Sequence, residues 1–454
     1  MKRLTTTPLL AATLLGALST LVACGPSAEM AHQAGDSVAS VKSSVPAEGS
    51  DEATIALYLA NHLDQETLDD DVTLDSRAAA NIVTYRAGAD GLEGTSDDLV
   101  FTTVAELDGV SYVGPSAFED LVGYGEDTLG MTGESVLGVL VGSFEAEAVL
   151  YLANNLSQDA LDHDVALDAR AARNIVSEGS ISDLNQLDAV SYVGQSAMDK
   201  LLAYADGMLS GQGLVLRDGT PYATLQDAVD AGGGTISLYK GVYTGETTIS
   251  TSLDLEGYPA GGSVLDGEGS VRALNITGGS PAFYDLEIRN GTPTGSSFTA
   301  DGGAARVYST GTVRFEGVDF VDNSAIMGGA IFASSGTLEL YDCFFDGNSA
   351  SSLGGAIYSY EDVTLDGVDF VDNSSPYGSA VRIFGSFSAP PHLSVVDSSF
   401  TDNLGSHYGA IALYDATASI TDTDFAGNSP ADVHVYAVGG YSGGDLSCDA
   451  TGCI

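Results

Sequence analysis

Side chains of the types that act on polysaccharides are present in the C-terminal half of the chain. Elimination from a uronate polymer needs a Lys or Arg base beside a Ca²⁺ ion that clustered carboxylates hold. Glycoside hydrolysis needs two carboxylates that flank the sugar bond. The basic candidates are Lys240, Arg272, Arg289, Arg306, Arg314 and Arg382, and the acidic candidates are Asp319, Asp369 and Asp424.

The spacing of these residues favours a structural interpretation over a catalytic one. No two of the basic residues share a short motif with acidic residues. Asp319, Asp369 and Asp424 each directly precede a phenylalanine, so a repeat alone explains their alignment. His407, in the stretch GSHYGA, is expected at an exposed turn. We therefore predict no catalytic residue and keep an enzyme as the alternative.

The phenylalanines belong to a repeat. They recur every 25 residues, with one step of 30, and an asparagine follows each of them by three positions. A Gly-Ala word or a close variant lies in each repeat, as in Gly328-Gly329-Ala330. A fixed period of this length indicates a solenoid. The repeated residues are Phe320, Phe345, Phe370, Phe400 and Phe425, with Asn323, Asn348, Asn373, Asn403 and Asn428.

Apolar residues alternate with polar ones inside each repeat, as Val363, Leu365, Val368 and Phe370 show. This alternation indicates two short strands in each repeat. Because like residues align from copy to copy, the copies are predicted to stack as parallel strands about 4.8 Å apart. We therefore predict a mainly β fold, a parallel β-helix. Its phenylalanines would line the core, its asparagines would form a hydrogen-bonded ladder, and its glycines would permit positive φ at corners.

The stretch from Pro221 to Gly267, PYATLQDAVDAGGG and onward, resembles the opening coils of right-handed parallel β-helix proteins of the pectin-lyase-like superfamily. The GGAI and FxxN words are similar to the repeats of polymorphic outer-membrane proteins. The resemblance implies a right-handed coil over residues 208–454. It implies no single activity, because that superfamily includes lyases, hydrolases, adhesins and inert shafts. The adjacent Asp pair and downstream Gly-His-Gly of its hydrolases are missing from residues 208–454.

Both ends of the solenoid are predicted to be shielded, because an uncovered last coil is an open strand edge. Thr224 to Ala231 is expected to form a short amphipathic helix over the first coil. Cys448 and Cys453 are spaced for a small disulfide ring that would close the last coil. Cys343 falls in the column of Val318 and Val368, so a buried thiol is expected there.

The N-terminus carries an export signal over residues 1–23. Lys2 and Arg3 precede an apolar run that ends in Leu-Val-Ala-Cys24, and Gly25 follows. The LVAC word resembles a bacterial lipoprotein cleavage site, which implies that Cys24 carries the lipid that anchors the chain to a membrane. By the sorting rules of such lipoproteins, Gly25 implies the outer membrane or the cell surface. Residues 24–50 would be a flexible tether, and an ordinary signal peptide remains the alternative.

The charge of the chain excludes one class of partner. With 63 acidic and 15 basic residues, the formal net charge is −48. Nucleic acids and anionic headgroups are repelled at long range by such a chain. We expect no nucleic-acid partner.

Two related segments precede the solenoid. The segment Leu57 to Val83 is echoed by Leu150 to Val176. Asp75 and Asp168 are placed to cap a helix in each copy. We predict helical modules at residues 51–125 and 144–207, joined by a linker at residues 126–143.

The ends of the two modules, LDGVSYVGPSAFEDLV and LDAVSYVGQSAMDKLL, resemble the helix-hairpin-helix motif. That motif offers backbone amides to a DNA phosphate. Here Tyr112 and Tyr192 replace its first glycine, and Ser116 and Ser196 stand where a lysine is common. The modules are therefore predicted to be packing or protein-binding spacers.

The insert Gly88 to Val100 in the first module is rich in glycine and acid. Its Asp90, Asp97 and Asp98 could hold Ca²⁺ through carboxylate oxygens, and an acidic turn exposed to water is the alternative.

Taken together, these features predict a non-catalytic surface lipoprotein. Its solenoid would present a face for adhesion, or for binding a glycan or a protein. Two alternatives stay open: a polysaccharide lyase or glycoside hydrolase that acts on an acidic polysaccharide, and a structural spacer.

Overall fold

The structure is a computed structural model that describes residues 45–89, 91, 97–207, 213–258, 261–296, 299–385 and 390–436. The predicted signal, Cys24, Asp90, Cys448 and Cys453 lie outside the described residues. By its contacts the chain divides into Met1–Ser44 and Val45–Ile454, and every element below belongs to the second unit. Within the described residues, no helix combines the length and the apolar character needed to cross a membrane.

The first helical module begins where Ser50 caps a helix by accepting a hydrogen bond from the amide of Ala53. Asp75 caps a second helix in the same way, as its position in the sequence predicts. Their apolar faces pack into one core. The elements are α1 (Asp51–His62), the π-helix η1 (Thr67–Asp71), α2 (Ser76–Arg86), α3 (Val104–Asp108) and α4 (Pro115–Asp127).

The second module repeats this order of elements around its own core. Asp168 caps its third helix, as predicted. The segment equivalent to η1 is here an ordinary α-helix. In sequence, the antiparallel pair β1 (Ser135–Val136) and β2 (Val139–Leu140) lies between the two modules. A hydrogen bond joins the modules, since Tyr58 Oη of the first donates to Glu145 Oε2 of the second (2.6 Å). The elements are α5 (Phe144–Asn155), α6 (Gln158–His163), α7 (Ala169–Glu178), α8 (Leu184–Ala189) and α9 (Gln195–Gly207).

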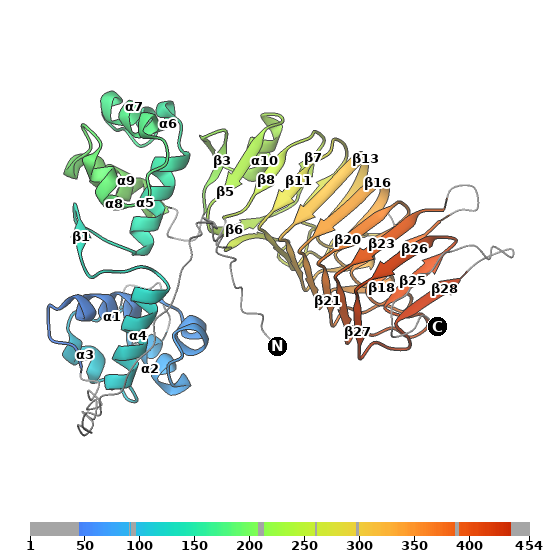
Figure 1. Ribbon diagram of the computed structural model, residues 1–454, viewed down its shortest axis with the longest axis horizontal. Helices are drawn as coiled ribbons and strands as arrows, with labels where there is room; N and C mark the ends of the chain where they lie inside the picture. Colours follow the sequence, from blue (N-terminus) through green and yellow to red (C-terminus); the bar gives the residue numbers. More distant parts are fainter. Residues whose placement is uncertain are drawn as a thin grey trace, which may run out of the picture. The chain divides into compact units, whose positions relative to one another are not determined.

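The rest of the described chain, residues 213–436, is called the repeat region here and is built mainly of parallel strands (Figure 1). Sixteen strands form one sheet, eight form a second, and β15 (Ser324–Met327) pairs with β18 (Ser349–Leu353). The eight-stranded sheet contains β6 (Gly241–Thr244), β9 (Ser263–Asp266), β12 (Glu287–Arg289), β14 (Asp319–Val321), β17 (Phe344–Asp346), β21 (Asp369–Val371), β24 (Ser399–Thr401) and β27 (Asp424–Ala426).

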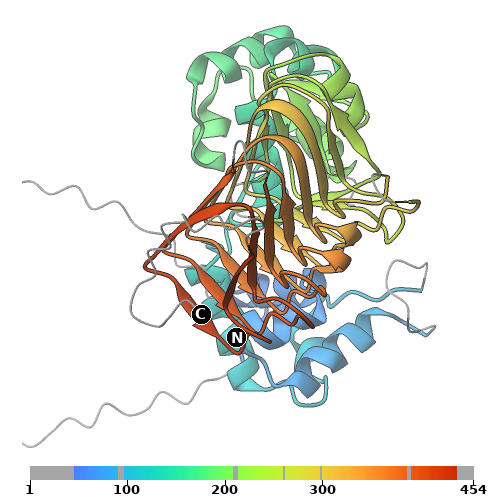
Figure 2. The ribbon, with the colours of Figure 1, turned by 90° about the vertical axis from the view of Figure 1, so that its right-hand side faces the viewer.

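In the larger sheet, strands one repeat apart pair in parallel, and the repeats follow one another in sequence order (Figure 2). The parallel strands are β5 (Thr235–Leu238), β7 (Thr247–Ile249), β8 (Asp254–Glu256), β10 (Leu274–Ile276), β11 (Ala282–Tyr284), β13 (Ala305–Glu316), β16 (Ile331–Tyr341), β19 (Ile357–Ser359), β20 (Val363–Asp366), β22 (Val381–Phe384), β23 (His392–Val396), β25 (Ile411–Tyr414), β26 (Thr417–Thr421) and β28 (Val433–Tyr436).

The repeated phenylalanines stack in the core of the repeat region. The first four are fully buried, and Phe425 is partly buried at the far end. Ring centres of successive copies lie 4.5, 4.8, 4.6 and 5.1 Å apart, with nearly parallel planes. Offset or stacked rings at this spacing attract each other beyond the burial of their area. Each ring therefore fixes the register of the next repeat.

The repeated asparagines form a second ladder beside the rings. Asn348 Nδ2 donates to the carbonyl of Phe320 (2.8 Å) and to Asn373 Oδ1 (3.0 Å). Its own Oδ1 accepts from the amide and the Nδ2 of Asn323 (3.1 and 3.0 Å). Because the side chain is buried, these bonds satisfy groups that water does not reach. The ladder thus joins each repeat to the repeats before and after it.

The glycines of the GGAI words permit close backbone approach. Gly328 has φ 61°, and a Cβ on it would lie 2.0 Å from the carbonyl oxygen of Ile331. Gly329 has no room either, since a Cβ would meet the carbonyl of Gly355 at 1.9 Å. Both positions therefore require glycine.

The first edge of the larger sheet is closed by elements of two kinds. The predicted helix is present as α10 (Leu225–Asp230), with Thr224 as its N-cap, and its apolar residues join the core of the repeat region. An antiparallel hairpin, β3 (Val215–Arg217) and β4 (Thr220–Tyr222), pairs with the edge strand β5 and was not expected from the sequence. Leu216 and Tyr239 belong to the core of the second module, so the two cores meet there.

Replacement of Phe345 by alanine tests the ring stack. Phe345→Ala is expected to lower the free energy of unfolding by about 3–5 kcal/mol, because a buried ring is lost between two others. Phe344→Ala is the matched control, since this neighbour on β17 is partly exposed and should cost about 1 kcal/mol. Urea unfolding followed by circular dichroism measures both. Equal destabilisation by the two variants would contradict the stack.

Candidate functional site

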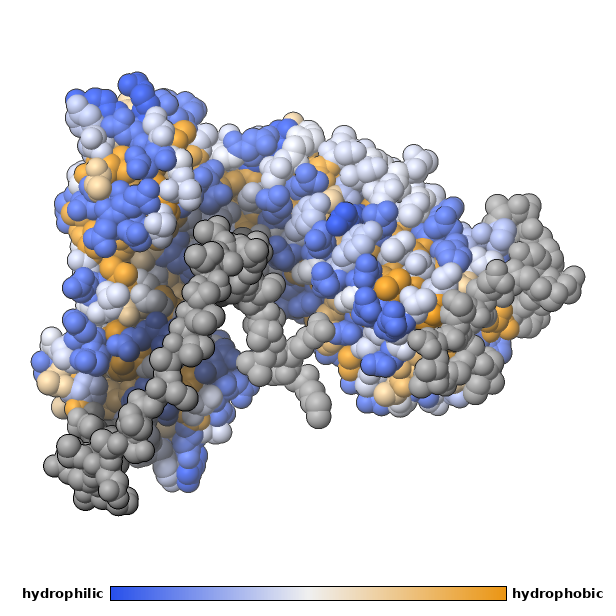
Figure 3. Space-filling model, viewed as in Figure 1, coloured by the Kyte–Doolittle hydropathy of each residue, from blue (hydrophilic) through white to orange (hydrophobic). Residues whose placement is uncertain are grey.

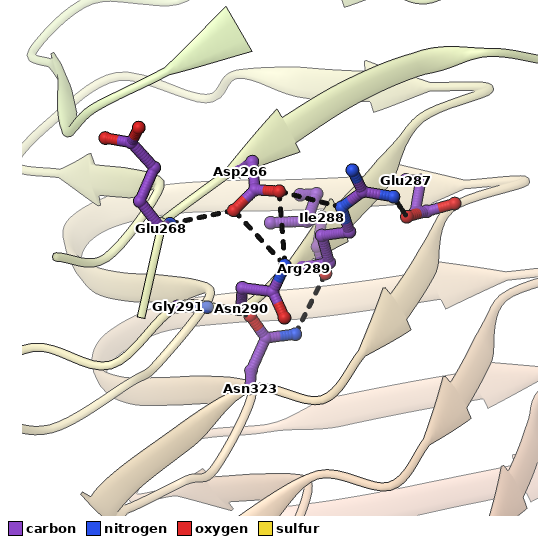
Figure 4. A network of polar contacts seen from close by, with 8 residues as sticks. All are labelled: Asp266, Glu268, Glu287, Ile288, Arg289, Asn290, Gly291 and Asn323. Atoms are coloured by element: carbon purple, nitrogen blue, oxygen red, sulfur yellow. Dashed lines mark hydrogen bonds and ion pairs between the residues drawn. The ribbon is translucent and has the colours of Figure 1, made fainter. Parts of the chain in front are cut away.

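Five of the six basic side chains considered for catalysis are held by polar partners. Figure 4 shows one of them, Arg289, between Asp266 and Glu287, next to the start of the asparagine ladder. A cation paired in this way is a poor base and a poor anchor for a ligand. The partners are Glu147 for Lys240 (2.8 Å), Glu246 for Arg272 (2.9 Å), Asp266 and Glu287 for Arg289 (2.8 and 3.0 Å), Asn275 for Arg306 (2.9 Å) and Glu316 for Arg314 (2.8 Å).

Arg382 differs from these five. No hydrogen bond or ion pair joins its guanidinium to any described residue, and the residue is 7% exposed. Its Cζ lies 6.0 Å from the ring centre of Tyr377 and 5.4 Å from that of Tyr408. Burial lowers the pKa of this guanidinium below its usual value, and the surrounding tyrosines raise it. A cation enclosed by rings and without an acid is available to an anion.

The aspartates considered for hydrolysis stand in one row on the eight-stranded sheet. Strand register places Phe344 between Asp319 and Asp369, and Ser399 between Asp369 and Asp424. The three carboxylates are therefore separated by two strands each, roughly 9–10 Å along the row. They lie along one face of a sheet with another residue between each pair, whereas hydrolysis needs carboxylates on either side of a sugar bond.

A row of aromatic side chains, called the outer ring row here, lies on the outer face of the larger sheet. Strand alternation places it there, because Ile331 and Ala333 belong to the core while Phe332 between them does not. Its members are Tyr308, Phe332, Tyr358, Tyr360, Phe384 and Tyr414, and their neighbouring ring centres lie 6.1, 5.8, 5.1, 5.7 and 4.5 Å apart.

The outer ring row reaches solvent at several points. Tyr308 is 37% exposed, and Tyr360, Phe384 and Tyr414 are partly exposed, while Phe332 and Tyr358 are buried. On the face drawn in Figure 3, hydrophobic patches over the repeat region are small and lie among hydrophilic side chains. A partly exposed ring with a hydroxyl offers both apolar contact and hydrogen bonding.

Four more rings lie beside the outer ring row: Tyr377, His407 and Tyr408 from the connecting segments, and His434 from β28. Tyr377 stacks on His407 (4.6 Å between centres), and Tyr408 stacks on His434 (4.5 Å). Tyr377 and Tyr408 are 5.1 Å apart. Arg382 lies against both tyrosines, so the guanidinium joins this group to the ring row.

A pocket of about 420 Å³ lies between α5 and the first strands of the repeat region. Tyr151, Tyr258, Glu147 and Glu256 are among its lining residues. The Lys240 ammonium lies 4.9 Å from the Tyr258 ring and pairs with Glu147, so the ion pair at this pocket is complete. Burial, with Asp254 and Asp285 nearby, raises the pKa of Glu256. The pocket therefore offers a less distinctive recognition group than Arg382.

The two tyrosines that stand in place of a glycine in the helical modules adopt a backbone conformation that glycine favours. Tyr112 and Tyr192 both have φ 71°, the conformation that glycine adopts easily. Arg77 lies 4.0 Å above the Tyr112 ring, and Asp75 pairs with Arg77 (2.7 Å). The second module repeats this arrangement with Arg170 over Tyr192. Each turn therefore carries a neutralised cation rather than a free one.

The remaining predicted site residues are placed as follows. The phenylalanines and asparagines of the repeat form the two core ladders. In the acidic insert, Asp97 Oδ2 accepts from the amide of Ala89 (2.8 Å), and the calcium prediction is untested because Asp90 lies outside the described residues. No group of three or more His, Cys, Asp or Glu suited to a metal occurs among the described residues. Cys343 is buried, as predicted, and burial raises the pKa of its thiol to about 12.

Sequence reasoning missed the outer ring row and the environment of Arg382. A signal was present, since each GGAI word or its variant leads into alternating aromatic residues, as in AIFAS, AIYSY, AVRIF and AIALY. Alternation by itself predicts which residues face the core, and it does not show that the outward residues come together in a row. Comparison with family models, with curated proteins and with solved structures finds no significant match to this chain.

The turns before the ladder asparagines concentrate negative charge. Asp322 and Asp372 adopt positive φ there, and both lie near Asp346 on β17. Burial first, and then Asp372 and Asp322, raise the pKa of Asp346. Because the folded value lies above the unfolded one, ionisation of Asp346 favours unfolding, and stability falls as the pH rises through these values.

Replacement of Asp346 by asparagine removes this charge. Asp346→Asn is expected to raise the midpoint of thermal unfolding at about pH 7 and to have no such effect at about pH 3, where the aspartate is protonated. Differential scanning calorimetry at the two pH values measures the difference. The same gain at both values would show that the carboxylate charge is not the cause.

Proposed function

We propose that this chain is an exported, lipid-anchored surface protein whose repeat region is a right-handed parallel β-helix that binds a glycan without cleaving it. The outer ring row is the observation that carries the proposal. It is continuous across five repeats and is partly exposed at Tyr308, Tyr360, Phe384 and Tyr414. The membrane anchor would be the acyl chains on Cys24.

The β-helix is supported by the way the chain visits its sheets. Each repeat contributes strands to the larger sheet and one strand to the eight-stranded sheet before the next repeat begins. From β5 to β28 the strands pair in parallel, and the repeated phenylalanines face one another, as Phe345 faces Phe370. The resemblance of the sequence to pectin-lyase-like coils gives the hand of the winding.

A sugar suits the outer ring row for two physical reasons. Sugar rings carry apolar C–H groups and hydroxyls, and tyrosine offers an apolar ring and a hydroxyl in return. The rings are also held by strands and by one another, so little side-chain entropy is lost when a ligand binds.

Binding without cleavage is supported by the state of the charged side chains. The acids that pair with Lys240, Arg272, Arg289 and Arg314 occupy the bases that elimination needs. The aspartates of the row occupy one position on alternate strands of a single sheet. Neither route to catalysis has its groups assembled in the described residues.

Removal of two rings tests glycan binding. Native affinity electrophoresis would use gels that contain gellan, κ-carrageenan, alginate, polygalacturonate, dextran or agarose. We expect at least one polymer to retard the wild type and expect Tyr360→Ala/Phe384→Ala to weaken that binding roughly 10-fold or more, because each stacked ring contributes about 1 kcal/mol. Tyr341→Ala, which removes a partly exposed tyrosine that contacts Arg314, is the control and should bind as the wild type does.

Two results would contradict this proposal. Migration of the wild type unaffected by every polymer would remove the evidence for glycan binding. Release of unsaturated or reducing ends from alginate or polygalacturonate, with or without Ca²⁺, would show that the protein is an enzyme.

The anchor is tested separately at Cys24. Cys24→Ser is expected to abolish incorporation of labelled palmitate and to move the protein from the membrane fraction to the soluble exported fraction, because one acylated cysteine holds the chain. Cys343→Ser, which changes a buried thiol, is the control and should keep the label. Palmitate incorporation into Cys24→Ser would place the lipid elsewhere or exclude it.

A further inference from the structure

The guanidinium of Arg382 is buried without a counter-charge among the described residues. Its Nε is shielded from solvent and has no hydrogen-bond acceptor. On the neighbouring strands Tyr358 stands in register before it and Ala412 after it. Tyr377 and Tyr408 lie against it from the turns. Tyr358, Ala412, Tyr377 and Tyr408 thus supply no negative charge to the guanidinium.

Such an arrangement is costly unless an anion completes it. A guanidinium loses its hydration on burial, and cation–π contacts with tyrosine return only part of that free energy. The chain has 63 acidic residues and only 15 basic ones, so acidic side chains that could pair with an arginine are plentiful. The comparable Arg314, which also lies over a tyrosine, has such a partner in Glu316.

We propose that Arg382 receives an anionic substituent, a carboxylate or a sulfate ester, of the glycan that the outer ring row binds. This inference rests on the proposed function and names the ligand class of the same site. The planar guanidinium presents parallel N–H donors that match either oxyanion, and carboxylates bind to it in a bidentate way. The enclosing rings hold the plane of the guanidinium in place and keep water away, which strengthens these bonds.

The distance between Arg382 and the ring row suits a single sugar unit. Arg382 and Phe384 are alternate residues of β22, so they point to the same side of the sheet roughly 6–7 Å apart. A sugar that contacts Phe384 and Tyr414 can thus place a charged substituent at Arg382. Because the net charge of −48 repels polyanions at long range, the site favours a glycan with sparse acidic units.

The test compares charged polymers with neutral counterparts. Gellan, whose glucuronates are sparse, is set against carboxyl-reduced gellan, and κ-carrageenan, which carries sulfate, is set against neutral agarose. Affinity electrophoresis of wild type, Arg382→Met and Arg382→Lys measures apparent dissociation constants. Arg382→Met is expected to weaken binding of one charged polymer roughly 10- to 100-fold, as the loss of charge-assisted hydrogen bonds predicts. Arg382→Lys should fall between, because it keeps the charge without the fork.

Arg314→Met is the matched control, since it removes an arginine that lies over a tyrosine but is paired with Glu316. It should leave binding unchanged. Wild-type affinity in Arg382→Met, with circular dichroism of a folded protein, would overturn the inference. Equal binding of gellan and carboxyl-reduced gellan, together with equal binding of κ-carrageenan and agarose, would overturn it as well and would leave neutral glycan binding by the rings intact.

A small anion separates this inference from the proposed function. Sodium acetate, compared with sodium chloride at the same ionic strength, is expected to raise the unfolding midpoint of the wild type but not that of Arg382→Met. If acetate has this effect while no polymer is retained, the anion site stands and the glycan assignment falls. If acetate has no effect and charged polymers bind no better than neutral ones, the anion site is excluded.

Discussion

The register between successive repeats is the constraint on which the rest of the structure depends. Phenylalanine rings stacked 4.5–5.1 Å apart and asparagine side chains that bridge one turn to the next allow only one alignment of the strands. A slip by one residue would turn every core side chain outward. Because the inner face is fixed in this way, the outer face repeats with equal precision, and residues from distant parts of the sequence become neighbours there. Both the outer ring row and the surroundings of Arg382 are consequences of that alignment.

Much of the inner architecture could be predicted from the sequence, since period and alternation are physical properties of a stacked strand. The ring stack, the asparagine ladder, the helix caps Asp75 and Asp168, and α10 all follow from local patterns. The hairpin of β3 and β4 could not be predicted, because strands of three residues carry too little alternation to be recognised. The packing of Leu216 into the core of the second helical module could not be predicted either, because it depends on contacts between elements far apart in the chain.

The candidate site was less predictable for a different reason. A sequence shows that Arg382 is an arginine among aromatic residues, but it does not show which acids come near. Five of the six basic residues turned out to have polar partners, such as Glu147 for Lys240, 93 residues away. The alignment of strands in the folded protein is needed to distinguish Arg382, which lacks an acidic partner among the described residues, from the basic residues that have polar partners. Strand alternation also gives the wrong exposure for Phe332. Its position on the outer face predicts an exposed side chain, but the ring is fully buried.

The meeting of two cores at Leu216 and Tyr239 bears on the order in which the protein assembles. The second module contains only short-range helices, which form quickly, whereas parallel strands must wait for distant partners. Once the second module has folded, its core can pack against Leu216 of β3 and against Tyr239, and β3 can pair with β5. Each repeat that has folded would then offer an edge strand to the next repeat. Because synthesis begins at the N-terminus, the repeats would then fold in the order in which they leave the ribosome, and the unpaired edge of the sheet would always belong to the newest repeat.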